Sequence, residues 1–205
     1  TGTGTGTPPE AAHEAAHDVV LDARGLRALA HPVRVQLLGL LRRFGPATAT
    51  QLARRLGLTS GATSYHLRQL DAAGFVEEDA QRGNARDRWW RSVHRATRLK
   101  GRELSEREPE ATMTYLRSVA AAYAVRVQEA LNELETMPEP WRDVFTLSDR
   151  FLYLTPDQAT RLKDELGALI ARHTSEATAS ANAAPPGARR VSIMTHFLPD
   201  LDDQP

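Results

Sequence analysis

The stretch that decides the fold runs from Leu52 to Val76 and reads LARRLGLTSGATSYHLRQLDAAGFV. Its first five residues place apolar side chains on one face of a short helix, because residues three and four apart share a face. Gly57 follows, and glycine readily adopts the left-handed conformation that ends a helix. A second helix is expected to start at Thr59 or Ser60 and to end at Gly74. The stretch therefore predicts two short helices joined by a tight turn.

Upstream of this stretch, the spacing of apolar residues predicts two further helices. The first covers residues 10–29 and ends before His31-Pro32, because the residue before a proline disfavours the helical region. The second stops near Phe44-Gly45-Pro46, a breaker sequence. The next helix is then expected to begin at Thr48 or Thr50.

Downstream, the sequence indicates a β-hairpin. Phe75-Val76 opens a strand, Arg82-Gly83-Asn84 forms a turn, and residues 88–93 return as a second strand. Two helices joined by a glycine-containing turn are the outline of a helix-turn-helix, and a hairpin directly after it is typical of a wing. We expect a winged helix-turn-helix DNA-binding domain over residues 10–100, after a low-complexity tail at residues 1–9.

The rest of the chain predicts a long helix followed by a small α/β region. Residues 103–135 carry an apolar stripe at helical spacing, which indicates a dimerisation helix over residues 101–137. The alternative is that this stripe packs on the chain's own wing domain. Over residues 138–205 we expect a β-α-β region that binds an effector or dimerises, with strands at residues 150–154 and 190–197. The fold class is thus mainly α with a β-hairpin wing, then a long helix and a small α/β C-terminal region.

Composition limits the class of protein. Hydrophobic residues make up 41% and charged residues 25% of the 205 residues, values typical of a folded globular protein. The absence of cysteine excludes disulfides, thiolate metal sites and cysteine nucleophiles. No apolar run approaches the roughly 18 residues that span a bilayer, so we expect a cytoplasmic protein.

The net charge of zero hides an uneven distribution. Residues 22–100 carry 15 Lys and Arg against 6 Asp and Glu, a net charge of +9, and the remainder carries 11 against 20, a net charge of −9. Arginine clustered in one domain indicates a polyanionic partner such as double-stranded DNA, although charge alone does not separate DNA from RNA or acidic lipid.

Three motifs carry a resemblance to a known family. They are Leu29-Ala30-His31-Pro32-Val33-Arg34, Leu52-Ala53-Arg54-Arg55-Leu56-Gly57-Leu58 and Ser64-Tyr65-His66-Leu67-Arg68-Gln69-Leu70. Together with Ala73-Gly74-Phe75-Val76 they resemble the ArsR-type winged-helix repressors over residues 22–95. The resemblance implies a homodimer whose recognition helices enter successive major grooves of a palindromic operator, usually to repress. The chain lacks the cysteines of the metal-sensing members, and the resemblance does not name an effector.

Candidate DNA-binding residues lie on the expected recognition helix, at the start of the helix before it and in the wing. On the recognition helix, small polar residues allow close approach to base edges, and Arg68 can bind guanine or phosphate. Wing arginines can enter a minor groove or bind phosphate. The alternatives are a solvated helix face, and helix capping by Thr48 and Gln51; His66 is expected to pack rather than to bind a ligand. The candidates are Thr48, Gln51, Ser60, Gly61, Thr63, Ser64, Tyr65, Arg68, Arg82, Arg86 and Arg88, of which Thr63 also begins the stripe expected to be buried.

Two other function classes compete with a regulator. His13-Glu14-Ala15-Ala16-His17 matches the H-E-x-x-H pattern of zinc peptidases. A catalytic zinc needs a third protein ligand, and the metzincin continuation would require Gly and His where Val20 and Ala23 stand. We therefore expect no enzyme and no cofactor, with metal binding at His13 and His17 left open. The other class is a protein-docking module, in which the winged helix serves as a docking surface for another protein. For a regulator, the sequence leaves open whether the signal is a small-molecule effector or a physical condition.

Overall fold

The computed structural model of the chain describes residues 18–82, 87–176 and 185–200. The chain divides into two units, Thr1–Glu133 and Leu134–Pro205. The predicted histidine pair at positions 13 and 17 and the candidate Arg86 lie outside the described residues.

The first helices begin at the capping residues that the sequence provides. Helix α1 (Ala23–Leu29) follows Asp22, whose carboxylate accepts a hydrogen bond of 2.7 Å from the backbone N–H of Gly25. Helix α2 (Pro32–Phe44) has proline in its first turn and is capped by His31, whose Nδ1 accepts from the backbone of the second helical residue. Each cap satisfies a backbone donor that has no partner inside the helix.

The two central helices agree with the prediction. Helix α3 (Ala49–Leu56) is capped by Thr48 and ends at Gly57, which has a φ of 65°. Helix α4 (Ser60–Ala72) follows the N-cap Thr59, and the chain leaves it through Gly74 with a φ of 78°. Because both glycines have positive φ, a side chain at either position would strain the backbone.

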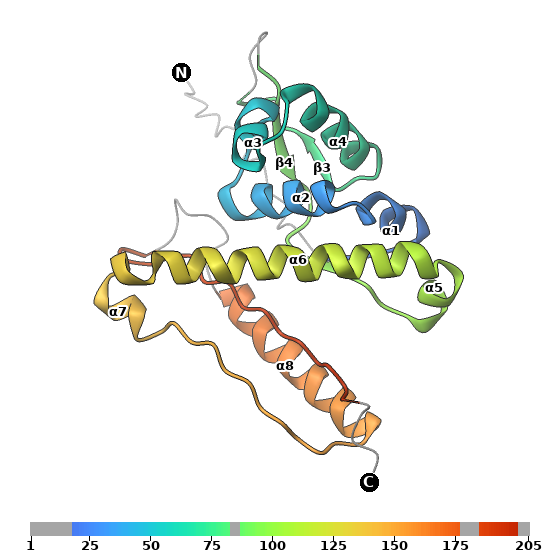
Figure 1. Cartoon of the computed structure of the whole chain (residues 1–205), viewed down its shortest axis with the longest axis vertical. Helices are drawn as coiled ribbons and strands as arrows, with labels where there is room; N and C mark the ends of the chain where they lie inside the picture. The colour runs from blue at the N-terminus through green and yellow to red at the C-terminus, as the bar shows by residue number, and fades with distance from the viewer. Residues whose placement is uncertain (1–17, 83–86, 177–184, 201–205) are drawn as a thin grey trace, which may run out of the picture. The chain divides into compact units, whose positions relative to one another are not determined.

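A three-stranded antiparallel sheet adjoins these helices. Strand β4 (Trp89–Ser92) lies between β3 (Val76–Glu78) and β2 (Ala47–Thr48). The strands β3 and β4 form the hairpin that the sequence predicted, and β2 adds a third strand that it did not. Figure 1 shows α3 and α4 beside this sheet, and the arrangement confirms a winged helix fold followed by a long helix.

The helix predicted for residues 10–29 is wrong where it includes Val19 and Val20. These two residues form strand β1 (Val19–Val20), which pairs in parallel with β5 (Thr97–Arg98). The backbone N–H groups of Val19 and Leu21 donate to the carbonyls of Ala96 and Arg98 at 3.0 and 2.9 Å. The pairing partner lies far along the chain, so helical spacing of nearby apolar residues did not reveal it.

The long helix predicted for residues 103–135 is two helices. Helix α5 (Arg102–Arg107) ends at Glu108, and α6 (Pro109–Glu133) starts at proline, whose ring prevents a helix from continuing through it. A 3-10 turn (Leu134–Thr136) follows α6 in the second unit. Helix α6 contacts α1 and α2, so part of its surface does pack on the chain's own winged helix (Figure 1).

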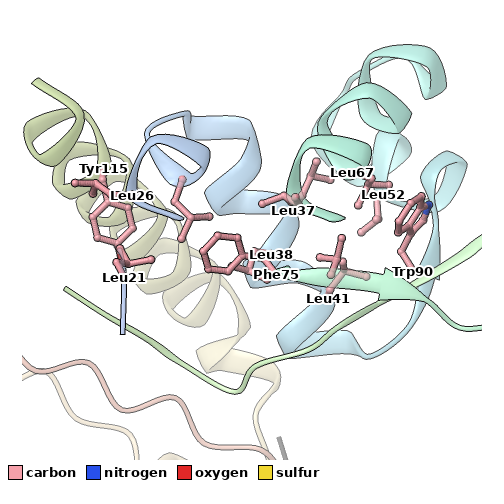
Figure 2. Packing of buried hydrophobic residues seen from close by; sticks show 13 residues of the cluster. Leu21, Leu26, Leu37, Leu38, Leu41, Leu52, Leu67, Phe75, Trp90 and Tyr115 are labelled. Atoms are coloured by element: carbon pink, nitrogen blue, oxygen red, sulfur yellow. The ribbon is translucent and has the colours of Figure 1, made fainter. Parts of the chain in front are cut away.

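One hydrophobic core joins α1, α2, α3, α4, α6 and the sheet (Figure 2). Leu26, Leu37, Leu67 and Leu70 have no exposed surface. Full burial of one such side chain contributes about 1.5 to 3 kcal/mol. Tyr115 of α6 completes the core, which fixes α6 against the winged helix. The core therefore packs α4, the β3–β4 hairpin and α6 against one another.

The second unit is less regular than the sequence predicted. It contains α7 (Glu139–Arg142) and the predicted helix α8 (Pro156–Glu176), but the strands expected at residues 150–154 and 190–197 are not formed. The first segment is rich in aromatic residues and the second alternates in the manner of a strand, yet neither has a strand partner among the described residues. In residues 134–173 and 185–200 no side chain is buried.

Among the helices in the described part of the chain, none has the combined length and apolar content that crossing a bilayer requires.

Candidate nucleic-acid interface

The outer face of α4 presents most of the predicted recognition residues. Ser60, Gly61 and Arg68 are exposed, and Tyr65 keeps 53% of its surface exposed. The inner face carries Leu67 and other residues of the core. Because the core fixes the inner face, the outer side chains project from a rigid helix.

Two predicted contact residues on α4 are less accessible. Thr63 has no exposed surface, and its Oγ1 has no hydrogen-bond partner among the described residues. It lies with Leu67 and Leu70 on the buried stripe, so its inclusion among the surface contacts was wrong on geometric grounds. Ser64 is half-buried beside this stripe.

Thr48 and Gln51 form a capping box at the start of α3. Thr48 Oγ1 accepts from the backbone N–H of Gln51 at 3.2 Å, and Gln51 Oε1 accepts from the backbone N–H of Thr48 at 2.9 Å. The side chain of Thr48 is buried, whereas Gln51 is exposed. The structure thus gives these residues the capping role that the sequence offered as the alternative.

The described wing arginines are exposed and paired with carboxylates. Arg88 Nε lies 3.0 Å from Glu78 Oε2, and its guanidinium lies over the ring of Trp90. Arg82 Nε lies 3.6 Å from Asp79 Oδ2. Ion pairs at such exposed positions contribute about 0 to 1 kcal/mol, so a phosphate can replace the carboxylates at little cost.

The structure adds two surface residues that the sequence analysis did not select. Thr50 and Arg54 are four residues apart on α3, and both are exposed. Ser60 Oγ lies 3.4 Å from Thr50 Oγ1, which places this face of α3 next to the start of α4. The helical spacing of Leu52, Ala53 and Leu56 already assigned the buried face of α3, and Arg54 could have been found from it.

Two histidines pack together, and one of them contacts Tyr65 of the outer face of α4. The ring centroids of His31 and His66 are 4.5 Å apart, and Tyr65 packs edge-on against His66. Burial lowers the pKa of both histidines, and the nearby positive charge of Arg34 lowers it further. His66 thus packs between helices, as the sequence predicted.

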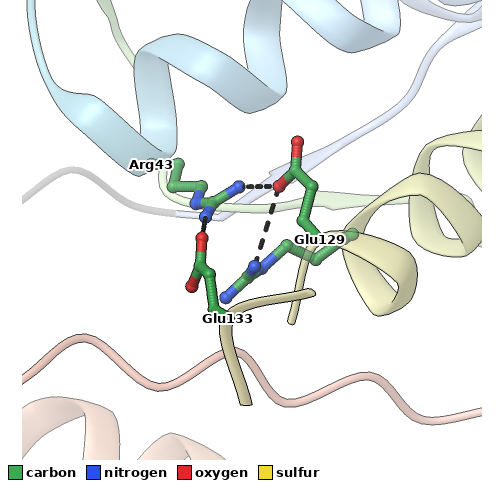
Figure 3. Close-up of polar contacts among 4 residues, drawn as sticks. Arg43, Glu129 and Glu133 are labelled. Atoms are coloured by element: carbon green, nitrogen blue, oxygen red, sulfur yellow. Dashed lines mark hydrogen bonds and ion pairs between the residues drawn. The ribbon is translucent and has the colours of Figure 1, made fainter. Parts of the chain in front are cut away.

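Ion pairs connect α2 with α6 (Figure 3). Arg43 pairs with Glu129, and its Nη2 lies 3.9 Å from Glu133 Oε1. Glu129 also lies 3.7 Å from Arg126 Nη1. Arg42, the neighbour of Arg43, donates to the carbonyl of His94 and to the hydroxyl of Thr97 at 2.9 and 2.8 Å. These contacts fix the end of α2 between α6 and the base of the wing.

In the described part of the chain, no three His, Asp or Glu side chains come together as a possible metal site. The chain contains no cysteine that could add a thiolate ligand.

Solved structures of other proteins resemble part of the chain, at TM-scores of 0.27 to 0.30. Reduced HlyU from Vibrio cholerae is 26% identical, over 45% of this chain and 80% of that one, at a TM-score of 0.30. Disulfide-formed AbfR is 15% identical, over 51% and 71% of the two chains, at 0.27. A transcriptional regulator from Thermotoga maritima is 14% identical, over 58% and 80%, at 0.28.

Comparison of the sequence with protein families and with curated proteins gives a match for one segment of the chain. The sequence matches none of the curated proteins. Residues 29–79 match the model of a family described as a helix-turn-helix domain. They comprise α2, β2, α3, α4 and β3, the first strand of the hairpin. This chain therefore contains a helix-turn-helix domain, extended by a wing.

Proposed function

We propose that this protein is a sequence-specific DNA-binding transcriptional regulator. The observation that carries the proposal is the exposed outer face of α4, held rigidly in a domain that matches a helix-turn-helix family. The surplus of basic residues between positions 22 and 100 supports a polyanionic partner. The resemblance to ArsR-type proteins supports a repressor that acts in the cytoplasm, and no catalytic role is assigned.

The chemistry of this face suits a DNA major groove. Gly61 and Ser60 allow the start of α4 to approach base edges closely, since their side chains are small. Arg68 lies two turns further along the same face, where a guanidinium can bind guanine O6 and N7. Arg82 and Arg88 in the wing are placed to bind backbone phosphate or a minor groove, after exchanging their carboxylate partners.

A second apolar stripe on α6 supports a homodimer. Met113, Leu116, Tyr123 and Leu131 are exposed, and their spacing places them on one face of the helix. This face borders the one that carries Thr112 and Tyr115 into the core. A helix with two apolar faces fits a position between the chain's own core and a second copy. Such a dimer would present two copies of α4 to a palindromic operator.

The second unit is proposed to contribute to dimerisation or to receive a signal. Its helix α8 and the extended segments around it bury no side chain among residues 134–173 and 185–200. Phe151 and Tyr153 are among the most exposed of its apolar side chains. A unit of this kind gains stability when a second copy or an effector covers its apolar surface.

Fluorescence anisotropy with the full chain tests the proposed function. The DNA is a labelled duplex from upstream of the protein's own gene, with a scrambled duplex as control, across a salt series. A regulator binds the first duplex more tightly, and its affinity falls steeply with salt because phosphate contacts release counterions. Binding that neither prefers a sequence nor depends on salt would contradict the proposal and favour the protein-docking alternative.

A further inference from the structure

A shallow pocket opens where α1, the start of α2 and the end of α4 meet. Its volume is about 270 Å³. Three of the side chains that line it are Arg24, Arg27 and Arg34, from α1 and α2. Gln69 and three alanines complete the described lining, which contains no carboxylate. The pocket thus concentrates positive charge at one concave site.

The positive charge of the pocket is only partly offset. Arg27 Nη1 lies 2.7 Å from Glu108 Oε1, the one carboxylate paired with these arginines within the described part of the chain. Arg24 donates to the carbonyl of Ala72, and Arg34 Nη2 lies 3.4 Å from the carbonyl of Arg27. Arg34 Nε is buried, without a hydrogen-bond partner among the described residues. Three guanidinium groups are therefore balanced by the charge of only one paired carboxylate among the described residues.

The geometry points to a phosphate group as the ligand of this pocket, and we propose that the pocket binds one. Each guanidinium has five N–H donors, and the hydrogen bonds described above use one nitrogen of each. Several arginines around one opening suit an anion with several oxygens and more than one charge, because charge-assisted hydrogen bonds are the strong ones. The phosphate belongs either to a small phosphorylated molecule or to the DNA backbone.

The pocket also contacts the helix that is proposed to read DNA, so this inference rests on the proposed function where it concerns regulation. Gln69, Ala72 and the following Ala73 are at the end of α4. Burial, then the charges of His31 and Arg34, lower the pKa of His66 on α4. A bound phosphate would offset the charge of Arg34 and add contacts beside the end of α4. Phosphate binding in the pocket would therefore influence the position of α4, the helix proposed to read DNA.

Binding of inorganic phosphate to the full chain tests the pocket itself. The measurement is an NMR titration of the arginine Nε–Hε signals, with phosphate, acetate and chloride compared at constant ionic strength. We expect saturable shifts with phosphate that are weakened about tenfold or more in Arg34→Gln and Arg27→Gln, the loss typical of a hydrogen bond to a charged group. Arg107→Gln removes the same charge on α5, where Arg107 pairs with Glu103, and should change nothing.

A second measurement identifies the source of the phosphate. The salt dependence of binding to a non-operator duplex is compared between the wild type and the same variants, whose folding is checked by circular dichroism. An arginine that neutralises a DNA phosphate contributes about one unit to the slope of log affinity against log salt. A reduced slope in Arg34→Gln assigns the pocket to the DNA backbone. Saturable phosphate binding with an unchanged slope assigns it to a small phosphorylated molecule.

Three results would overturn the inference. They are acetate binding as tightly as phosphate, equal phosphate binding in Arg34→Gln and the wild type, and no phosphate binding together with an unchanged salt slope. If the protein binds DNA selectively but gives one of these results, the phosphate-pocket inference is wrong and the proposed function stands. If the protein binds phosphate in the pocket but binds no DNA, the pocket inference stands and the proposed function is wrong.

Discussion

Tyr115 and Leu116 are consecutive residues of α6 that lie on different faces of the helix. Tyr115 is 7% exposed and belongs to the core of the winged helix, whereas Leu116 is 43% exposed and belongs to the outer apolar stripe. The same helix thus offers one apolar face to its own domain and a second to solvent. This relationship is the structural basis for expecting a dimer.

Leu116→Glu is expected to give a monomer. The substitution places a charge in the middle of the outer stripe, and burying an unpaired charge in an apolar interface is unfavourable. Sedimentation equilibrium of the variant and the wild type measures the change. Thr114→Glu places the same charge on another exposed position of α6 and should leave the dimer intact. An unchanged dimer in Leu116→Glu would place the interface elsewhere.

Thr63→Val is expected to stabilise the fold and to leave DNA binding unchanged. The hydroxyl of Thr63 is fully buried and has no partner among the described residues, and leaving such a group unsatisfied costs about 1 to 3 kcal/mol. Valine has nearly the same shape and removes that cost, so the free energy of unfolding should rise by up to this amount. Urea denaturation measures stability, and anisotropy measures affinity. A loss of DNA affinity would show that Thr63 reaches the DNA after all.

The stability of the fold is expected to fall as the pH decreases below about 6.5. Burial, then the charges of His31 and Arg34, lower the pKa of His66 in the folded protein. Above the ordinary histidine pKa of about 6.5, both states are neutral and the group contributes nothing. Below it, the unfolded chain binds the proton more readily, so protonation favours unfolding until the pH falls through the folded pKa.

Urea denaturation at several pH values between about 5 and 7.5 measures this effect. His66→Gln cannot titrate, so its stability should depend less on pH in this range. The same pH dependence in both proteins would contradict a role for His66. His31 is unsuitable for this test, because its ring also caps α2.

Arg68→Ala is expected to weaken binding to the preferred operator by about 1 to 3 kcal/mol and binding to random DNA by less. The reason is that Arg68 lies on the outer face of α4, where a guanidinium can read a base edge. Competition anisotropy with both duplexes measures the difference. An equal loss on both would make Arg68 a phosphate contact.

Most of the winged helix could be predicted from local sequence. Gly57 and Gly74 ended their helices as expected, and Thr48 and Thr59 capped the helices that follow them. Such signals act over a few residues, so they can be read from a short stretch of sequence. The strand at Val19 could not be found in this way, because its partner is Thr97.

The remaining differences have similar physical causes. Pro109 marked the division of the long helix, but the apolar spacing on both sides of it favoured a continuous one. The candidate surface of α4 was largely predictable, and Thr63 was misplaced because its residue type suits a contact while its spacing suits the core. The pairing of Arg82 and Arg88 with wing carboxylates depends on side-chain positions that the sequence does not reveal.

Selection of binding sites from a random-sequence duplex pool tests the central claim most directly, because the experiment itself determines the operator sequence. The full chain is incubated with the pool, and the bound DNA is amplified and sequenced over several rounds. A dimeric regulator enriches an inverted repeat whose half-sites are about one helical turn apart or a multiple of it. Arg68→Ala should lose preference at one position of each half-site. A pool that shows no enriched sequence, at salt concentrations where the protein binds DNA, would contradict the account.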